Sequence, residues 1–210
     1  MTLRAITSIA CAISAVATLT ASDQRSTRGA TTPAKPMAVE RRAACASPLG
    51  EGVKSKRAFC DVIISPTGAG SVSLEIPPHT GQSILYFDLH PRFEVSQPDG
   101  NPMALFQRHR PVVAVVGPTG DVIDRAATEG EYRSVTDLID RLPGQKPGEY
   151  KVVGPGAPTT VKVFIPASVS SVGIVGLRVE IANRFQQQSY PEPNRPVAIV
   201  SNWRIEYTAK

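Results

Sequence analysis

Residues 111–123 read PVVAVVGPTGDVI, and this stretch decides the fold class of the 210-residue chain. Its first half, 112–116, is apolar and mostly β-branched, which favours a strand over a helix. Residues 117–120 follow with Pro and Gly where a type I turn prefers them. Val122 and Ile123 then begin a second strand, so the stretch predicts a β-hairpin. Because the first strand is apolar on both faces, we expect it to be covered on both sides.

Alternating apolar and polar residues indicate further strands on either side of this hairpin. Side chains of a strand point to opposite faces in turn, so a period of two indicates one buried face. Pro and Gly residues end each run, as is typical of strands joined by turns. The residues expected to face the core are Cys60, Val62, Ile64; Val72, Leu74, Ile76; Leu85, Phe87, Leu89; Val161, Val163, Ile165; Leu177, Val179, Ile181; and Val197, Ile199, Trp203, Ile205, Tyr207.

This series of short strands predicts an all-β fold, a single antiparallel β-sandwich domain over residues 45–210. A jelly roll is the preferred architecture, and an immunoglobulin-like sandwich is the alternative. The immunoglobulin bridge joins strands far apart in the sequence, whereas Cys45 and Cys60 lie close together. The cysteine spacing therefore favours the jelly roll.

One short helix is expected near residues 134–142. Ser134 is a suitable N-cap, and Asp137 places a negative charge in the first turn. Pro143 and Gly144 end the segment. The helix would have about two turns and cross an open end of the sandwich. Its apolar face would consist of Val135, Leu138, Ile139 and Leu142.

The N-terminus reads as an export signal over residues 1–21. One basic residue, Arg4, precedes an apolar run over 5–19, and small residues 20–22 complete the pattern of a cleavable leader. The mature chain would then contain no transmembrane segment. We therefore expect a secreted or periplasmic protein.

The cysteines support this expectation. Removal of the leader takes Cys11 with it and leaves Cys45 and Cys60, which would form a disulfide in an oxidising compartment. Such a bridge would stabilise the fold by about 3 kcal/mol and fasten the start of the domain to its first strand. As an alternative, residues 8–11 (SIAC) resemble a bacterial lipoprotein box, which would make Cys11 a lipid anchor.

The positive charge of the chain lies mostly outside the predicted domain. Residues 22–44 are rich in Pro, Ser, Thr, Ala and basic residues without apolar periodicity, which indicates a disordered linker. From Cys45 onward, 17 Lys and Arg residues face 16 Asp and Glu residues. The single basic cluster there, residues 108–110 (RHR), is expected in an exposed loop. A nucleic-acid partner is therefore not expected.

No signature of a well-marked hydrolase class occurs, since the chain lacks G-x-S-x-G, H-E-x-x-H and P-loop motifs. Asp88 and His90 share a strand face with Tyr86, and with His109 they would offer donors suited to zinc. The competing interpretation is an exposed polar face with a histidine at a sheet edge. No cofactor is expected.

Four acidic residues near the hairpin could supply the two carboxylates of a glycosidase: Asp121, Asp124, Glu129 and Glu131. Glycosidases need two carboxylates across a sugar cleft, about 5–10 Å apart. Four acids in and after a hairpin are more typical of a solvated loop. No catalytic residue is therefore assigned.

The long connection over residues 183–196 is the best candidate for a binding site. It has no evident secondary structure, and loops of this length in compact domains are often functional. Aromatic, amide and guanidinium groups are the types that bind polyhydroxylated ligands or protein partners. The candidate ligand-binding residues are Arg184, Phe185, Gln187 and Tyr190. The competing interpretation, which the local sequence favours, is an ordinary surface loop whose Phe185 and Tyr190 pack onto the sandwich.

The sequence thus predicts a secreted or periplasmic, non-enzymatic binding domain for an extracellular glycan or protein. Two alternatives stay open. One is an extracellular hydrolase that uses surface carboxylates or a metal, and the other is a structural component of the cell envelope. The oligomeric state follows from none of these patterns.

Overall fold

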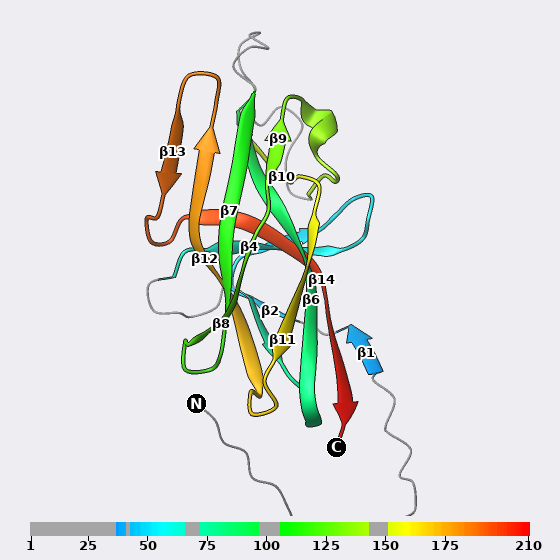
Figure 1. The fold of residues 1–210 in the computed structure, drawn as a ribbon. Helices are drawn as coiled ribbons and strands as arrows, with labels where there is room; N and C mark the ends of the chain where they lie inside the picture. Colours follow the sequence, from blue (N-terminus) through cyan, green and yellow to red (C-terminus); the bar gives the residue numbers. More distant parts are fainter. Residues whose placement is uncertain (1–36, 41–42, 66–71, 97–105, 143–150) are drawn as a thin grey trace, which may run out of the picture. The chain divides into compact units, whose positions relative to one another are not determined.

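Two antiparallel sheets face each other in the computed structural model, which describes residues 37–40, 43–65, 72–96, 106–142 and 151–210 (Figure 1). The first sheet contains β1 (Met37–Glu40), β3 (Pro48–Glu51), β4 (Ala58–Ile63), β6 (His79–Ser96), β10 (Lys151–Pro155), β11 (Thr159–Ile165) and β14 (Pro196–Ala209). The second contains β2 (Ala44–Cys45), β5 (Val72–Glu75), β7 (Gln107–Val116), β8 (Val122–Ala127), β9 (Gly130–Tyr132), β12 (Ser171–Ala182) and β13 (Gln187–Tyr190).

The strand order is that of a jelly roll. In the first sheet β4, β14, β6 and β11 are successive neighbours, and in the second β5, β12, β7 and β8 are. When these eight strands are numbered one to eight along the chain, the first sheet has the order 1-8-3-6 and the second has the order 2-7-4-5. This is the strand order of a jelly roll, which consists of two Greek keys. The remaining strands extend this framework. The predicted antiparallel β-sandwich and the preference for a jelly roll are confirmed.

The hairpin that decided the fold class forms as predicted. Strand β7 pairs with β8, and the turn is closed by hydrogen bonds from Gly117 N to Asp121 O (2.8 Å) and from Gly120 N to Gly117 O (3.0 Å). Gly120 has a φ of 85°, a left-handed conformation that glycine adopts without strain. Strand β7 is buried on both faces over its second half, since Val115 and Val116 belong to different apolar clusters.

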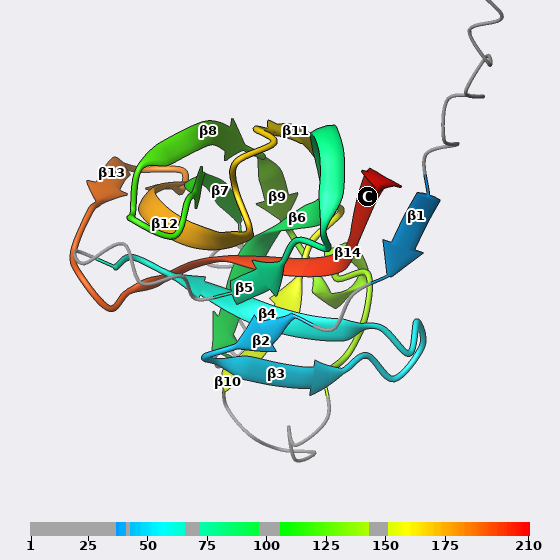
Figure 2. The ribbon, with the colours of Figure 1, turned by 90° about the horizontal axis from the view of Figure 1, so that it is seen from below.

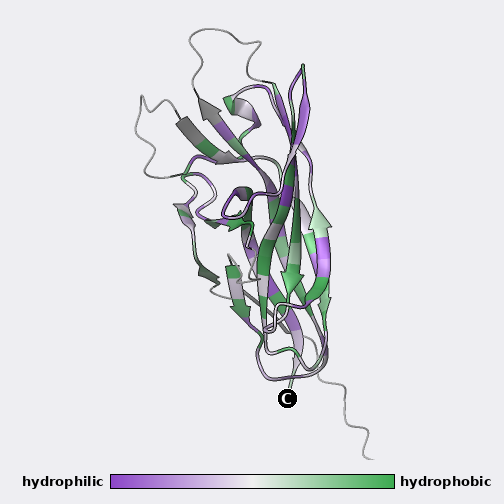
Figure 3. Cartoon of the chain, turned by 90° about the vertical axis from the view of Figure 1, so that its left-hand side faces the viewer, coloured by the Kyte–Doolittle hydropathy of each residue, from purple (hydrophilic) through white to green (hydrophobic). Residues whose placement is uncertain are grey.

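The main core lies between the sheets, where β14 and β6 contact β12 and β7 (Figure 2). Apolar and hydrophilic residues alternate along many strands (Figure 3), as expected when one face of a strand is buried. Most of the predicted inward residues belong to this core. Its members include Cys60, Val62, Ile64, Val72, Leu74, Ile76, Leu85, Phe87, Leu89, Val163, Ile165, Val179, Val197, Ile205 and Tyr207.

Two predicted core residues face the other way because of β-bulges. The register of β12 shifts between Gly176 and Arg178, so Leu177 packs in a separate cluster on the far side of its sheet. The register of β14 shifts after Ser201, at a residue with left-handed φ, and Ile199 therefore faces away from Ile205. A bulge adds one residue to a strand and reverses the alternation beyond it.

The predicted helix is shorter than expected. Only a 3-10 turn forms, Val135–Asp137, and the chain is already extended at Leu138. The predicted cap is present: Ser134 Oγ accepts a hydrogen bond from Thr136 N (3.3 Å), and Asp137 Oδ2 accepts one from Ser134 N (2.9 Å). The expectation of a helix of about two turns was therefore wrong.

Tertiary contacts explain why the helix stops. Asp140 accepts hydrogen bonds from the backbone N–H groups of Lys54 (2.9 Å) and Ser55 (2.8 Å), in the turn between β3 and β4. Leu142 packs against Phe59 and Ile199 on the outer face of the first sheet. These partners replace the bonds that a second helical turn would have formed.

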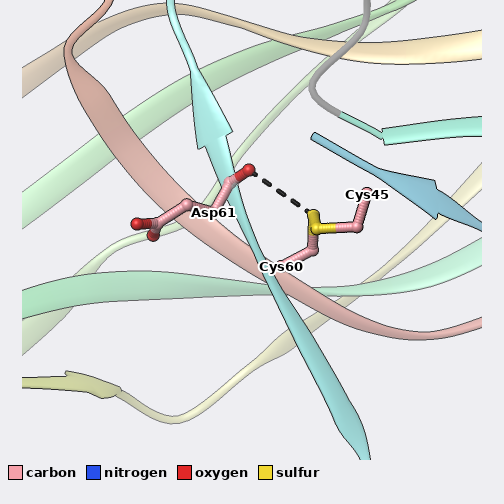
Figure 4. The surroundings of a disulfide bond; sticks show 3 residues. All are labelled: Cys45, Cys60 and Asp61. Carbon is pink, nitrogen blue, oxygen red and sulfur yellow. Dashed lines mark hydrogen bonds between the residues drawn. A yellow bond between two sulfur atoms is a disulfide. The ribbon is translucent and has the colours of Figure 1, made fainter. Parts of the chain in front are cut away.

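The predicted disulfide is present and joins the two sheets (Figure 4). Cys45 lies on β2 of the second sheet and Cys60 on β4 of the first, with their Cα atoms 6.0 Å apart. The bridge fastens the start of the predicted domain to its first predicted strand, as expected. The sequence did not indicate that these two strands belong to opposite layers of the sandwich.

Most of the N-terminal predictions concern residues outside the described ranges. These are the leader over 1–21, the lipid anchor at Cys11 and most of the linker over 22–44. Within that linker, Met37–Glu40 forms strand β1, which pairs with β14 from Tyr207 to Arg204. Among the described residues, no helix is long and apolar enough to cross a membrane.

Candidate functional site

The connection 183–196 is more ordered than its sequence suggested. Its central part forms β13, which pairs with the end of β12 from Val179 to Ala182. The turn between these strands is closed by a hydrogen bond from Asn183 N to Gln186 O (2.9 Å). Asn183 Oδ1 also accepts hydrogen bonds from Phe185 N (2.8 Å) and Gln186 N (2.9 Å), an Asx-type arrangement that fixes the turn.

The turn displays one large aromatic side chain. Phe185 is 93% exposed, the largest exposure among the large apolar side chains of the described residues. Arg184, beside it, is also exposed. An exposed apolar ring on a turn held by three hydrogen bonds is available to a partner without much rearrangement of the backbone.

The other two predicted ligand-binding residues lie elsewhere on the hairpin. Gln187 borders a shallow depression of about 210 Å³ together with Arg108, Arg110, Glu129, Glu180 and Ala182. Tyr190 packs against the main core, and the guanidinium carbon of Arg195 lies 4.1 Å from its ring centroid. The structure therefore does not bring Arg184, Phe185, Gln187 and Tyr190 together in one site. They occupy the tip, the outer face and the base of one hairpin.

A larger cleft opens between the two sheets, on the other side of β7 and β12. It has a volume of about 400 Å³, within the range of ligand sites. Because strand residues alternate, odd-numbered residues of these strands face the cleft and even-numbered residues border the outer depression. The lining residues are Arg92 and Glu94 of β6, Gln107 and His109 of β7, Val179 and Ile181 of β12, Arg195 just before β14, and Pro196 and Val197 at its start.

Arg92 is held firmly in the wall of this cleft. Its Nε donates to Asp61 Oδ1 (3.0 Å) and its Nη1 to Glu94 Oε2 (2.9 Å). Asp61 is itself buried, and burial raises the pKa of its carboxyl group, although the charge of Arg92 opposes this. The second arginine, Arg195, is 38% exposed and has a looser contact with Glu192 (3.8 Å).

His109 is a neutral imidazole in the same wall. Burial lowers its pKa to about 4, and the charges of Arg92 and Arg195 act in the same direction. The ring packs against Phe93, with centroids 5.1 Å apart, and Nε2 lies 3.2 Å from Gln107 Oε1. The prediction that residues 108–110 form an exposed loop was wrong, because they belong to strand β7.

The basic residues on either side of His109 are paired. Arg108 Nε lies 3.7 Å from Glu129 Oε1, and Arg110 Nη1 lies 3.7 Å from Glu180 Oε2. Glu180 also contacts Arg178 (3.3 Å). Acidic partners are therefore interleaved with the arginines on this face of the sheet, an arrangement unlike the basic face of a nucleic-acid-binding domain.

The candidate metal ligands Asp88 and His90 are buried rather than exposed. His90 is 0% and Asp88 5% exposed, so the competing interpretation of an exposed polar face was wrong. Strand β6 lies inside the sheet, between β14 on one side and β10 and β11 on the other. The face of β6 that carries Asp88 and His90 is covered by residues that include Arg57 and Gly156.

Both side chains have complete sets of protein partners. His90 Nδ1 lies 2.9 Å from Gly156 O and therefore donates, which leaves Nε2 to accept from Ser201 Oγ (2.9 Å). Burial lowers the pKa of His90, consistent with a neutral ring. Asp88 accepts hydrogen bonds from Arg57, Thr160 and Asn202, at 3.3, 2.7 and 3.0 Å.

No group of three His, Cys, Asp or Glu side chains that could hold a metal occurs in the described part of the chain. Binding of a metal at Asp88 and His90 would require the loss of the hydrogen bonds just described. These residues act as a buried polar network that ties β6 to β11, to β14 and to the turn after β3.

The four acidic residues near the hairpin form local hydrogen bonds or ion pairs. Asp121 closes the turn after β7 and accepts a hydrogen bond from Thr119. Asp124 accepts one from Arg125 N (2.7 Å). Glu129 pairs with Arg108, and Glu131 pairs with Arg133 (2.6 Å).

Sequence reasoning missed the cleft between the sheets. Its polar residues Arg92 and Glu94 lie on β6 and Gln107 on β7, whereas Arg195 immediately precedes β14 and is far from them in the sequence. Each looks like an ordinary outward-facing polar residue when its own strand is considered. The one signal that could have pointed to them is the break in apolar alternation near the ends of β6 and β12.

Comparison with known proteins yields no family assignment. No protein-family profile matches the chain, and no curated protein matches it. Among solved structures, the K1 cleaved adhesin domain of Lys-gingipain from Porphyromonas gingivalis W83 aligns with 83% of this chain and 99% of its own, at 10% identity and a TM-score of 0.28. The VP2 subviral particle of infectious bursal disease virus aligns with 96% of this chain and 44% of its own, at 14% identity and a TM-score of 0.22. Such low scores carry no argument about function.

Proposed function

We propose that this protein is an extracytoplasmic binding domain without catalytic activity, and that the β12–β13 hairpin contacts its glycan or protein ligand. The observation that carries the proposal is the exposure of Phe185, 93%, on a turn fixed by hydrogen bonds. An aromatic ring gains free energy when a partner removes it from water. Large aromatic residues are also the ones that most often dominate binding energies at protein surfaces.

The free energy that a partner would gain by covering Phe185 supports a binding role. Covering a phenylalanine side chain contributes about 1.5–3 kcal/mol, which corresponds to roughly a tenfold to hundredfold change in affinity. The backbone of the turn is already ordered, so little entropy is lost when a ligand binds there. The same ring could also stack against a sugar face.

The surroundings of the tip supply polar groups for such an interface. The depression beside it combines guanidinium, carboxylate and amide groups of Arg108, Arg110, Glu180 and Gln187. An apolar anchor with polar groups around it is the common arrangement of protein interfaces and of sugar sites. The predicted leader supports an extracytoplasmic setting, and the Cys45–Cys60 disulfide is consistent with one.

The test compares Phe185→Ala with Phe164→Ala. Phe164 is another phenylalanine with a large exposed fraction, 50%, but it lies on β11 in the other sheet. Both variants should fold normally. Purified wild-type protein would be screened on glycan arrays and by pull-down from extracellular fractions.

Loss of a captured ligand in Phe185→Ala, with retention in Phe164→Ala, is the expected result. Two outcomes contradict the proposal. One is the absence of any specific ligand in both screens, and the other is equal binding by the two variants.

A further inference from the structure

The cleft between the sheets has no part in the interface around Phe185. Its nine lining residues include two arginines, a glutamate, a glutamine and a histidine, and the other four are apolar. A volume of about 400 Å³ matches a small polar molecule such as a monosaccharide or disaccharide. The mixed lining distinguishes the cleft from a purely apolar groove.

The charge of the cleft favours an anion. Arg92 and Arg195 both line it, and the positive charge of each is felt at His109, where both lower the pKa of the ring. Arg92 is already bonded to Asp61 and Glu94. Arg195 is the more available of the two, because its contact with Glu192 is 3.8 Å long and its side chain is 38% exposed.

The remaining polar groups suit hydroxyls. The carboxylate of Glu94 accepts hydrogen bonds, and the amide of Gln107 both donates and accepts them. A ligand with several negative charges, such as a polyphosphate, would be repelled by Glu94 and Asp61. Ile181 and Pro196 are partly exposed and provide an apolar edge against which the C–H face of a pyranose ring can pack, whereas Val179 and Val197 are buried behind them.

From these features we infer that the cleft binds a sugar acid, with its single carboxylate at Arg195 and its hydroxyls at Glu94 and Gln107. The inference rests on the proposed binding function and supplies a ligand class for it. It uses a different surface from Phe185, so the two proposals can fail separately. A simple aliphatic acid lacks the hydroxyls that Glu94 and Gln107 would bind.

The test is a titration of the ¹⁵N-labelled full chain with sodium D-glucuronate, followed by NMR, with D-glucose as the neutral control. The matched variants are Arg195→Gln and Arg178→Gln. Arg178 is also partly exposed and paired with a glutamate, but it does not line the cleft. Phe185→Ala is titrated in parallel.

Saturable shifts are expected at residues 92–94, 107–109, 179–181 and 195–197. Glucose should bind at least about tenfold more weakly, the equivalent of one charge-assisted hydrogen bond. Arg195→Gln should lose a similar factor, whereas Arg178→Gln and Phe185→Ala should bind glucuronate like the wild type.

Four results would overturn the inference: no saturation by glucuronate, equal binding of glucose, shifts outside the cleft, or an unchanged affinity in Arg195→Gln. Stronger binding of N-acetyl-dialanine than of glucuronate would assign the cleft to peptide carboxylates and likewise exclude a sugar acid. Each of these results can be interpreted even if Phe185→Ala has no effect on the ligand of the β12–β13 hairpin.

Discussion

Cys45 and Cys60 join the two layers of the sandwich, since the first lies on β2 and the second on β4. Strand β2 has only two residues and pairs with β5 alone. The disulfide is therefore the strongest link that holds this short edge strand to the domain. Cys60 itself is fully buried in the main core.

Replacement of both cysteines by serine should lower the free energy of unfolding by about 3 kcal/mol, because the unfolded chain regains the entropy of an open loop. The 15-residue separation sets this size. Urea unfolding followed by circular dichroism measures the loss. Wild-type protein unfolded with a reductant should behave like the double variant. Equal stability of oxidised and reduced protein would contradict the prediction.

The stability of the protein should fall as the pH drops below neutrality. Burial lowers the pKa of His109 from 6.5 to about 4 and also lowers that of His90. The folded state therefore binds fewer protons than the unfolded state in this range. The stabilisation is complete above the unfolded pKa of 6.5 and declines as the pH falls toward the folded value. For His109 the loss between about pH 7.5 and about pH 5 is about 2 kcal/mol.

His109→Gln should remove the part of this pH dependence that is due to His109 and leave the part that is due to His90. The measurement is urea unfolding at both pH values for wild type and variant. His79→Gln is the control, since His79 belongs to neither buried site. A pH profile that is unchanged in His109→Gln would show that other groups are responsible.

Asp140→Asn should destabilise the protein by about 1–3 kcal/mol, because an amide nitrogen would replace one of the two buried carboxylate oxygens that accept hydrogen bonds from Lys54 N and Ser55 N. Burial by itself raises the pKa of Asp140, but hydrogen bonds from Ser55, Lys54 and Arg141 lower it to about 2. Its contribution is thus present above pH 3.8 and is lost as the pH falls through about 2.

Unfolding in urea near neutral pH measures the effect of Asp140→Asn. Asp124→Asn serves as the control, since Asp124 is exposed and accepts one local hydrogen bond. The interpretation fails if both variants are equally stable.

Gly176→Ala should cost about 1–3 kcal/mol through overpacking. A Cβ atom at this position would lie 2.7 Å from Val197 Cγ2 and 3.0 Å from backbone atoms of Ile63 and Ile64. Backbone atoms of the opposite sheet cannot move aside easily. Gly117→Ala is the control, because the atoms nearest to its Cβ would be those of the exposed Asp121 side chain, which can rotate away, rather than backbone. Thermal unfolding of the two variants distinguishes a tight approach of the sheets from a general effect of glycine replacement.

Local patterns were sufficient wherever a strand kept its regular period. The hairpin of β7 and β8 was predictable because β-branched residues and a Pro-Gly turn specify it without distant contacts. The cap of the 3-10 turn at Ser134 was predictable for the same reason. The face of the sheet on which Leu177 and Ile199 lie was not predictable, because a bulge depends on the neighbouring strands rather than on the residues that form it.

The candidate site was predictable only in part. The sequence indicated an aromatic and amide-rich segment at residues 183–196, and the structure presents Phe185 of that segment to solvent. It could not indicate that Tyr190 would pack inward beneath Arg195. It also could not indicate the cleft, whose walls come from four strands.

The sequence by itself determined the all-β class, the turns and the partners in the disulfide, because these depend on backbone preference and on local spacing. The tertiary structure alone decided that the disulfide joins opposite sheets, that Asp88 and His90 are buried, and that Arg92, His109 and Arg195 meet in one cleft. Each of these depends on which strands become neighbours. In a jelly roll, neighbouring strands are often distant in the chain, and no local pattern records that pairing.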